Sequence, residues 1–272
     1  MKKNRYLFHG QHLEAKVKAV QVFLLASGIK KGDCVAAYLP NIPEAIACFL
    51  AVNSIGAVWS CCSPDFGVET VIERFAQIQP KLFIAADGYR YNNKSFDRSA
   101  EINAIRNEID SIEATLFIPY QNAEAILDNT TTWQTVQSHQ QDDKPLQFTP
   151  VPFEHPIWVL YSSGTTGRPK AITHSHGGVL LEHLKYMTFH NDVKAGENFF
   201  WFTTTGWMMW NFLQASLLKG ATAVLYDGSP GFPSLKRLWA LAESLPIHHF
   251  GTSAPFLTAC MKRDLALNQS FD

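Results

Sequence analysis

Short apolar runs alternate with segments of helical periodicity along most of the chain, and this alternation constrains the fold more than any other feature. Residues 35–39 and 81–86 are apolar runs, whereas residues 12–27 carry apolar side chains at helical spacing. Parallel strands need a long crossover connection, which is usually a helix. The sequence therefore predicts an α/β fold with mostly parallel sheets flanked by helices.

The expected elements fall into three parts. Residues 1–120 are predicted to form a first α/β lobe, and residues 151–272 a second one. The apolar period fades between them, so residues 121–150 are predicted to be a surface connection. The predicted helices cover residues 12–27, 43–55, 68–77, 95–109, 176–189, 235–244 and 253–262, with another from Trp207. The predicted strands cover residues 35–39, 57–60, 81–86, 114–118, 157–161, 199–203, 221–226 and 247–250.

A loop of small and hydroxylated residues follows the strand predicted at residues 157–161. Residues 161–170 read Tyr-Ser-Ser-Gly-Thr-Thr-Gly-Arg-Pro-Lys. The glycines have no Cβ and let the backbone approach a ligand, while the hydroxyls add donors and the lysine adds a positive charge. Ligands of open α/β sheets bind at the carboxyl ends of strands, where this loop lies. We expect phosphates to be bound by Ser162, Ser163, Gly164, Thr165, Thr166, Gly167 and Lys170.

Two other interpretations of this loop fit its sequence less well. In the nucleoside-triphosphatase loop Lys follows the second Gly directly, whereas Arg168 and Pro169 separate Gly167 from Lys170 here. A Ser/Gly-rich hairpin without a ligand is the structural alternative. Hairpin turns rarely combine four hydroxyls, two glycines and a terminal lysine, so the phosphate-binding interpretation is preferred.

The charge and the cysteine content of the chain indicate which partners it can bind and in which cellular compartment it is expected. The chain has 23 Lys and Arg against 24 Asp and Glu, a net charge of -1, so no broad basic surface for nucleic acid or an anionic membrane is expected. Its five cysteines lack zinc spacing and do not suggest a disulfide framework. The basic start is not followed by the unbroken apolar segment of a signal peptide. These features predict a cytoplasmic protein that binds small molecules.

A second cluster, residues 203–211, reads Thr-Thr-Thr-Gly-Trp-Met-Met-Trp-Asn and follows the strand predicted at residues 199–203. It is expected to form another turn from a strand into a helix at the same sheet edge. Trp and Met mostly fill protein interiors, so composition alone favours a packing role for this cluster.

The loop at residues 161–170 resembles the signature of the adenylate-forming acyl-CoA synthetases, a Ser/Thr/Gly loop followed by Pro-Lys. Ala171 departs from the family pattern, which usually has Gly after the Lys. Further segments are similar to one subfamily, the acetoacetyl-CoA synthetases: residues 37–44, 63–67, 86–91, 202–212, 225–231 and 250–254. The resemblance implies part of the large amino-terminal domain of an adenylate-forming enzyme. The adenine and ribose segments and the mobile carboxyl-terminal domain of the family are expected to lie outside this chain.

The resemblance also implies a two-step reaction. Acetoacetate attacks the α-phosphorus of ATP and releases pyrophosphate, and the acyl group then passes to the thiol of coenzyme A. Lys170 and Thr166 are the implied catalytic residues that hold the leaving pyrophosphate, and Thr166 also helps to bind magnesium. Trp207, Met208 and Met209 are implied to contact the acyl chain. Two alternatives stay open: a catalytically inactive nucleotide-binding remnant, or one half of a split enzyme whose partner is the downstream half.

Overall fold

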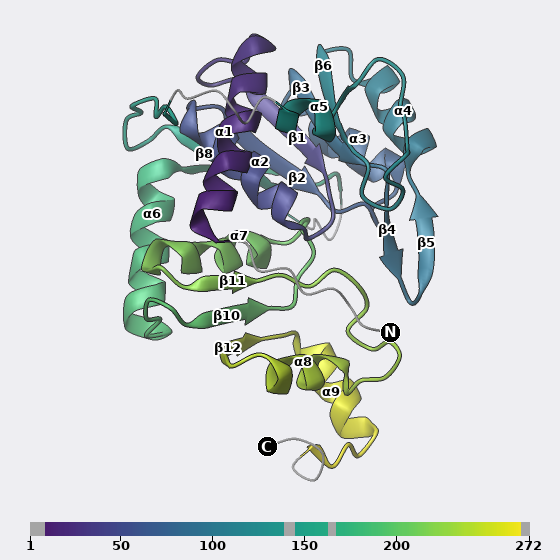
Figure 1. The fold of residues 1–272 in the computed structure, drawn as a ribbon, viewed down its shortest axis with the longest axis vertical. Coiled ribbons are helices and arrows are strands. Elements are labelled where there is room, and N and C mark those ends of the chain that lie inside the picture. Colours follow the sequence, from purple (N-terminus) through teal and green to yellow (C-terminus); the bar gives the residue numbers. More distant parts are fainter. Residues whose placement is uncertain (1–8, 139–144, 163–166, 268–272) are drawn as a thin grey trace.

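The larger sheet of this computed structural model has seven strands in the order β7-β6-β3-β1-β2-β8-β9 (Figure 1). The structure describes residues 9–138, 145–162 and 167–267. Each neighbouring pair in the order is parallel except β8 and β9, which are antiparallel. The strands are β1 (Cys34–Tyr38), β2 (Val58–Cys62), β3 (Leu82–Ala86), β6 (Ala114–Ile118), β7 (Thr131–Thr132), β8 (Pro156–Tyr161) and β9 (Ala171–Ser175).

Helices cover both faces of this sheet, and the alternation of side chains along β1 shows which helix covers which face. Val35 and Ala37 belong to a core that includes α1 (Gly10–Ala26) and α2 (Pro43–Ser54). Ala36 and Tyr38 belong to a second core with α3 (Val68–Phe75) and α4 (Ser99–Glu108). Strands with both faces covered carry continuous apolar runs, which explains why β1, β2 and β3 were recognisable in the sequence.

A smaller parallel sheet of three strands lies beside the first, in the order β11-β10-β12. Helix α7 lies between the two sheets (Figure 1). Trp210 of α7 packs in the core of the large sheet, and Leu213 packs in the core of the small one. The strands are β10 (Asn198–Trp201), β11 (Thr222–Val224) and β12 (Ile247–Gly251). The helices of this part are α6 (His176–Lys185), α7 (Met208–Ala215), α8 (Arg237–Ser244) and α9 (Ala254–Lys262), with a π-helical turn at Tyr186–His190 and a 3-10 turn at Ser216–Lys219.

The predicted α/β class with mostly parallel sheets is confirmed, but several elements differ from the expectations. The helix predicted from residue 95 begins at Ser99, because β4 (Gly88–Tyr91) and β5 (Lys94–Asp97) form an antiparallel hairpin before it. Asn92 and Asn93 both have positive φ, as a tight hairpin turn requires.

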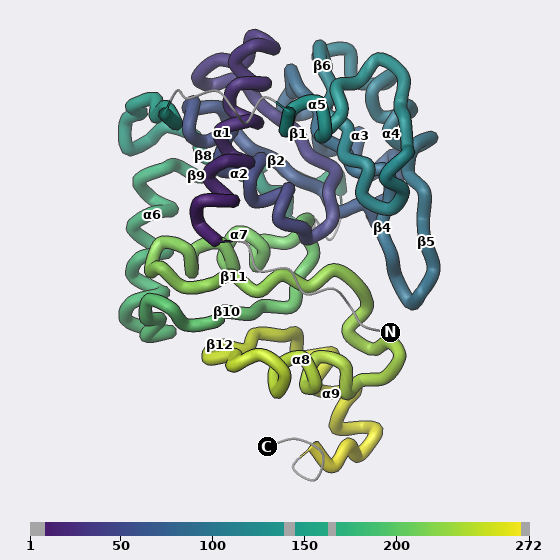
Figure 2. Tube along the Cα trace, in the orientation of Figure 1, coloured from purple at the N-terminus to yellow at the C-terminus, as the bar shows by residue number. Residues whose placement is uncertain are grey.

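Strands and helices also occur where none was predicted. Strand β9 lies beside β8 (Figure 2). The segment 121–150, expected to be a surface connection, contains β7 and α5 (Trp133–Ser138), and Trp133 and Val136 are buried against α1 and its neighbours. The large sheet therefore draws strands from both expected lobes, and the division into lobes stays a prediction.

Candidate functional site

The loop predicted to bind phosphate connects β8 to β9. Tyr161 pairs with Ala171, and the Ser162 N–H donates to the Lys170 carbonyl at 3.1 Å. The chain therefore makes a hairpin here, which is the topology of the structural alternative. A hairpin loop at the carboxyl end of β8 can still present backbone N–H groups to an anion. Ser163, Gly164, Thr165 and Thr166 lie outside the described residues.

The described loop residues are accessible from solvent. Gly167 and Lys170 are exposed, and Ser162 is partly exposed. The Ser162 hydroxyl accepts a hydrogen bond from the Lys170 N–H at 3.3 Å. Within the described residues, no carboxylate lies within 4.0 Å of the Lys170 ammonium. The ammonium is thus available to an anionic ligand.

Helix α3 and the residues just after it anchor the returning arm of the hairpin. The Gln77 side chain donates to the Pro169 carbonyl at 2.9 Å and accepts from the Ala171 N–H at 3.3 Å. One turn earlier, Glu73 lies 4.0 Å from Arg168 in an exposed ion pair, a kind of contact that contributes little. Gln77 therefore positions the backbone next to Lys170.

Arg74 and Phe66 connect this loop to the second cluster. The Arg74 guanidinium lies 5.8 Å from the Tyr161 ring centroid and 5.1 Å from the Phe66 ring centroid. A Cβ added to Gly206 would lie 2.7 Å from Cζ of Phe66, so only glycine fits without a shift of the ring. Phe66 and Arg74 thereby link the segments that follow β10 and β8, but the prediction of one shared sheet edge is wrong, because β8 belongs to the seven-stranded sheet and β10 to the three-stranded sheet.

Residues 207–210 divide into an exposed part and a buried part. Trp207 is 61% exposed and Met208 52% exposed, while Trp210 is fully buried and stacks on Trp59. Met209 packs partly against the core of the small sheet. The interior role expected from composition thus applies to Trp210. Trp207 and Met208 are the members of the cluster available to a ligand.

A cavity of about 440 Å³ opens between the two sheets. The loops after β1, β2, β10 and β11 form its walls together with the β4-β5 hairpin, so it too lies at carboxyl ends of parallel strands, where ligands of such sheets bind. It is lined by Pro40, Asn41, Ser63, Pro64, Asp65, Tyr89, Arg90, Tyr91, Phe202, Thr203, Thr204, Tyr226, Asp227, Gly228 and Pro230.

Sequence reasoning assigned none of these residues to the site, and the cavity lining does not include Trp207, Met208 or Met209. The signal that could have found the lining is positional: these residues lie in the last positions of a predicted strand or within a few residues after it.

One hydrogen bond links a segment after β6, on the large sheet, to a cavity wall of the small sheet. The Tyr120 hydroxyl donates to the Asp227 carboxylate at 2.9 Å. Burial raises the pKa of Tyr120, so the phenol stays neutral and remains a donor. Asp87 in turn accepts hydrogen bonds from the N–H groups of Tyr120, Gln121 and Asn122, each at 2.8 Å. A buried carboxylate therefore shapes the segment that reaches across to the small sheet.

The described residues offer few ligands for a magnesium ion. No group of three or more His, Cys, Asp or Glu side chains suited to a metal ion occurs there. Glu73 is the carboxylate that contacts the loop arm, and it is paired with Arg168. Magnesium in nucleotide sites is held largely by phosphate oxygens and water with one or two protein ligands. The described residues do not supply a set for it, and Thr166 lies outside them.

Comparisons with known proteins agree with the α/β fold. Relatives include acetoacetyl-coenzyme A synthetase of Rhizobium meliloti (strain 1021), 46% identical over 262 residues, and acetoacetyl-CoA synthetase of Danio rerio, 42% identical over 245 residues. The alignments cover 94% and 87% of this chain but 40% and 36% of the relatives. The solved acetoacetyl-CoA synthetase from Streptomyces lividans is 46% identical with a TM-score of 0.90, covering 96% of this chain and 40% of that one.

The chain thus spans about two fifths of the length of the relatives it matches. In the part that the structure describes, no helix has the length and apolar character needed to cross a bilayer. The model of the family described as AMP-binding enzyme matches residues 9–271, which is nearly the whole sequence. This chain belongs to the AMP-binding enzyme family.

Proposed function

We propose that this chain carries the ATP-binding loop of an acid-thiol ligase that activates acetoacetate as acetoacetyl-AMP and passes the acyl group to coenzyme A. The observation that carries the proposal is the hairpin loop at the carboxyl end of β8, with the Lys170 ammonium accessible beside it. The family match and the acetoacetyl-CoA synthetases among the relatives support the choice of substrate.

In the first step a carboxylate oxygen of the acid attacks the α-phosphorus, and the bond from that phosphorus to the pyrophosphate oxygen breaks. Catalysis of such a transfer depends mainly on positioning and on charge stabilisation. Lys170 and the backbone N–H groups of the loop would hold the negative charge of the leaving pyrophosphate. Thr166 would contact the same phosphates and the magnesium ion that accompanies ATP.

In the second step the thiol sulfur attacks the acyl carbon, and AMP leaves. We assign coenzyme A to the cavity between the sheets, because the cavity combines aromatic and apolar walls with the cation of Arg90. An elongated thiol that carries phosphates matches both features. The lining also contains the carboxylates of Asp65 and Asp227, and Asp227 accepts a hydrogen bond from Tyr120. Trp207 and Met208 would contact the short acyl chain from their exposed position, with Met209 behind them. The five free cysteines fit the reducing cytoplasm, where we place the reaction.

The phosphate assignment is tested by nucleotide binding to Lys170→Ala. We expect the Kd values for ATP and pyrophosphate to rise about tenfold, because one charge-assisted contact is lost, and the Kd for acetoacetate to stay unchanged. Lys262→Ala is the control, since Lys262 is an exposed lysine on α9. Equal ATP affinity in the parent and in Lys170→Ala would count against the assignment.

A second candidate function follows from the share of the relatives' length that this chain spans. Because the chain spans 40% of the Rhizobium meliloti relative, it could act as one half of a split enzyme or as an inactive nucleotide-binding remnant. Acetoacetate-dependent exchange of pyrophosphate into ATP separates these cases. Exchange by the chain alone supports an autonomous adenylating unit. Exchange only with a polypeptide that corresponds to the rest of the relatives supports the split enzyme, and none in either case supports the remnant.

A further inference from the structure

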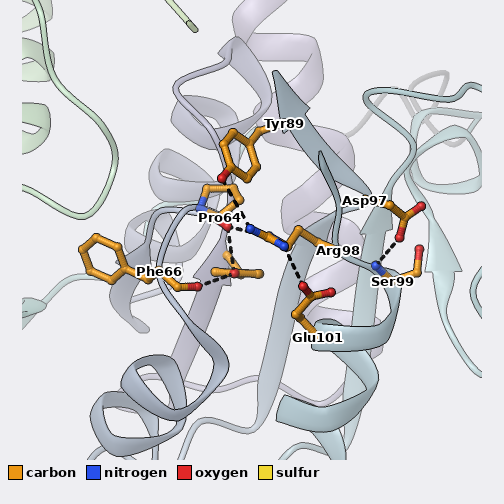
Figure 3. Close-up of polar contacts among 8 residues, drawn as sticks. Pro64, Phe66, Tyr89, Asp97, Arg98, Ser99 and Glu101 are labelled. Carbon is orange, nitrogen blue, oxygen red and sulfur yellow. Dashed lines mark hydrogen bonds and ion pairs between the residues drawn. The ribbon is translucent and has the colours of Figure 1, made fainter. Parts of the chain in front are cut away.

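Arg98 lies outside the cavity lining but contacts two of the walls. Its Nε donates to the Pro64 carbonyl at 2.8 Å, and its Nη2 donates to the Tyr89 hydroxyl at 3.3 Å (Figure 3). Pro64 belongs to the loop after β2, and Tyr89 belongs to the β4-β5 hairpin; both line the cavity. One guanidinium thus joins two walls that are otherwise formed by separate segments.

The same guanidinium contacts both strands of the hairpin. It lies 5.2 Å from the ring centroid of Tyr89 on β4 and 5.9 Å from that of Phe96 on β5. The two rings stack with their centroids 4.9 Å apart. A cation over aromatic rings is attracted by their π-electrons. The hairpin forms a two-stranded sheet of its own, and an isolated two-stranded sheet is only marginally stable. The contact with Arg98 therefore helps to hold the hairpin in place.

The position of Arg98 is itself well determined. Its backbone N–H donates to the Asp87 carbonyl at 2.7 Å, which ties the residue to the end of β3. Its Nη1 donates to Glu101 in the first turn of α4 at 2.5 Å, with both side chains partly buried. These contacts orient the planar group, so that its remaining donors point at Pro64 and Tyr89.

Tyr38 of β1 also contacts the loop after β2. Its hydroxyl lies 2.9 Å from the Pro64 carbonyl and 2.7 Å from the Phe66 carbonyl, and its one proton can be shared between them. Burial raises the pKa of Tyr38, so the hydroxyl remains a donor. The loop after β2 is therefore held on the sheet by Tyr38, while Arg98 connects it to the hairpin.

We propose that Arg98 is a positioning residue that sets the separation between loop 63–66 and hairpin 88–97, and thereby determines how tightly the cavity binds an elongated, phosphate-bearing thiol. The identity of that ligand rests on the function proposed above, whereas the separation of the walls does not. Arginine suits this task because its planar group presents five donors in a rigid fork. A lysine ammonium keeps the charge but cannot span the same set of partners.

The test compares Arg98→Lys with Arg106→Lys. Arg106 is the matched control because it lies on α4, the helix that begins directly after Arg98, and also donates to backbone carbonyls, those of Asp128 and Asn129. Hydrogen–deuterium exchange without ligand is measured first. We expect exchange in residues 63–66 and 88–97 to increase together by at least about threefold in Arg98→Lys, since local opening becomes more frequent. The control should leave both segments as in the parent.

The affinity for coenzyme A is measured next. We expect the Kd to rise about tenfold in Arg98→Lys, while the Kd for ATP changes less than about twofold, because none of the described residues of the loop after β8 is among the contacts of Arg98. Unchanged exchange in both segments would overturn the proposal. The proposal is also overturned if exchange rises in Arg98→Lys but its Kd for coenzyme A equals that of Arg106→Lys, because the separation of the walls would then not govern binding.

The outcomes distinguish this inference from the proposed function. If the parent protein does not bind coenzyme A, the assignment of the cavity fails, and the exchange measurement alone decides whether Arg98 holds the walls. Tyr89→Phe provides a milder second variant, because it removes only the hydroxyl that Arg98 contacts. We expect faster exchange in residues 88–97 and parent-like exchange in residues 63–66; parent-like exchange in both would contradict a contribution of the hydroxyl contact, because the contact of Arg98 with the ring is kept.

Discussion

The loop between β8 and β9 and the cavity between the two sheets lie at the carboxyl ends of parallel strands, but they are assembled from very different lengths of sequence. The loop is one continuous segment, residues 161–170, anchored mainly by Gln77. The cavity lining runs from Pro40 to Pro230 and depends on residues that never reach the cavity, such as Arg98 and Asp87. A continuous site is sensitive to substitutions within it, whereas an assembled site is sensitive to substitutions that disturb the packing of its supports.

The sharpest test of this comparison is Trp210→Ala. Trp210 is fully buried, stacks on Trp59 and donates to the Asn41 side chain at 3.0 Å, and Asn41 lines the cavity. We expect a loss of about 3–5 kcal/mol in the free energy of unfolding, as for other large buried aromatic residues replaced by Ala. Urea unfolding measures it. Trp207→Ala is the control, and because Trp207 is exposed its effect should stay within about 0.5 kcal/mol. Equal losses in the two variants would contradict the burial of Trp210.

A smaller effect is expected for Asp87→Asn. Asp87 is 2% exposed and accepts three backbone N–H groups, and an amide has one oxygen with which to replace two. We expect the free energy of unfolding to fall by about 2 kcal/mol, because a buried donor loses its partner. Thermal or urea unfolding measures the loss. Asp97→Asn is the control, since Asp97 is exposed and its contact to the Ser99 N–H can be kept by an amide. If both variants have the same free energy of unfolding as the parent, the Asp87 carboxylate is not what holds residues 120–122.

The β8 side of the molecule should respond to pH through His183. Burial lowers the pKa of His183 from 6.5 to about 4, and its ring lies 5.7 Å from that of Trp158 on β8. The unfolded chain then binds the proton more readily than the folded one, so stability is present above pH 6.5 and is lost as the pH falls towards 4. Between pH 7 and pH 5 we expect a contribution of about 1 kcal/mol, reduced for the partial exposure of the ring. Urea midpoints at both pH values should differ less in His183→Gln than in the parent; an identical pH dependence would contradict this assignment.

The smallest effect on stability is expected at the loop itself. Gln77→Ala removes two exposed hydrogen bonds to the arm that carries Lys170, which should lower the free energy of unfolding by about 0.5 kcal/mol. The same variant should raise the Kd for ATP by about threefold, because the backbone beside Lys170 is less well positioned. Glu73→Ala on α3 is the control, since its ion pair with Arg168 is long and exposed. Loss of coenzyme A binding in Gln77→Ala would show that the two sites are not independent.

Strands buried on both faces were the most predictable part of the fold. The runs that form β1 and β3 are apolar throughout, because helices cover both sides of them, and such runs stand out in a sequence. Strand β9 was missed because it lies at the edge of the sheet with residues 171–173 exposed, so its side chains carry no strong apolar pattern. Strand β7 is only two residues long, too short for any periodicity.

The sequence by itself determined the α/β class, the order of most elements and the position of a small, hydroxyl-rich loop at the end of a strand, because each of these depends on residues close together in the chain. Only the tertiary structure decided that this loop closes a hairpin, that Trp210 is buried while Trp207 is exposed, and that Arg98 connects two walls of a cavity. The burial of Trp210 and the contact of Arg98 with Pro64 depend on partners far away in the chain, and no local pattern of residues encodes which distant partner a side chain will meet. The hairpin is closed by the nearby pair Tyr161 and Ala171, but its returning strand is exposed and carries no apolar pattern.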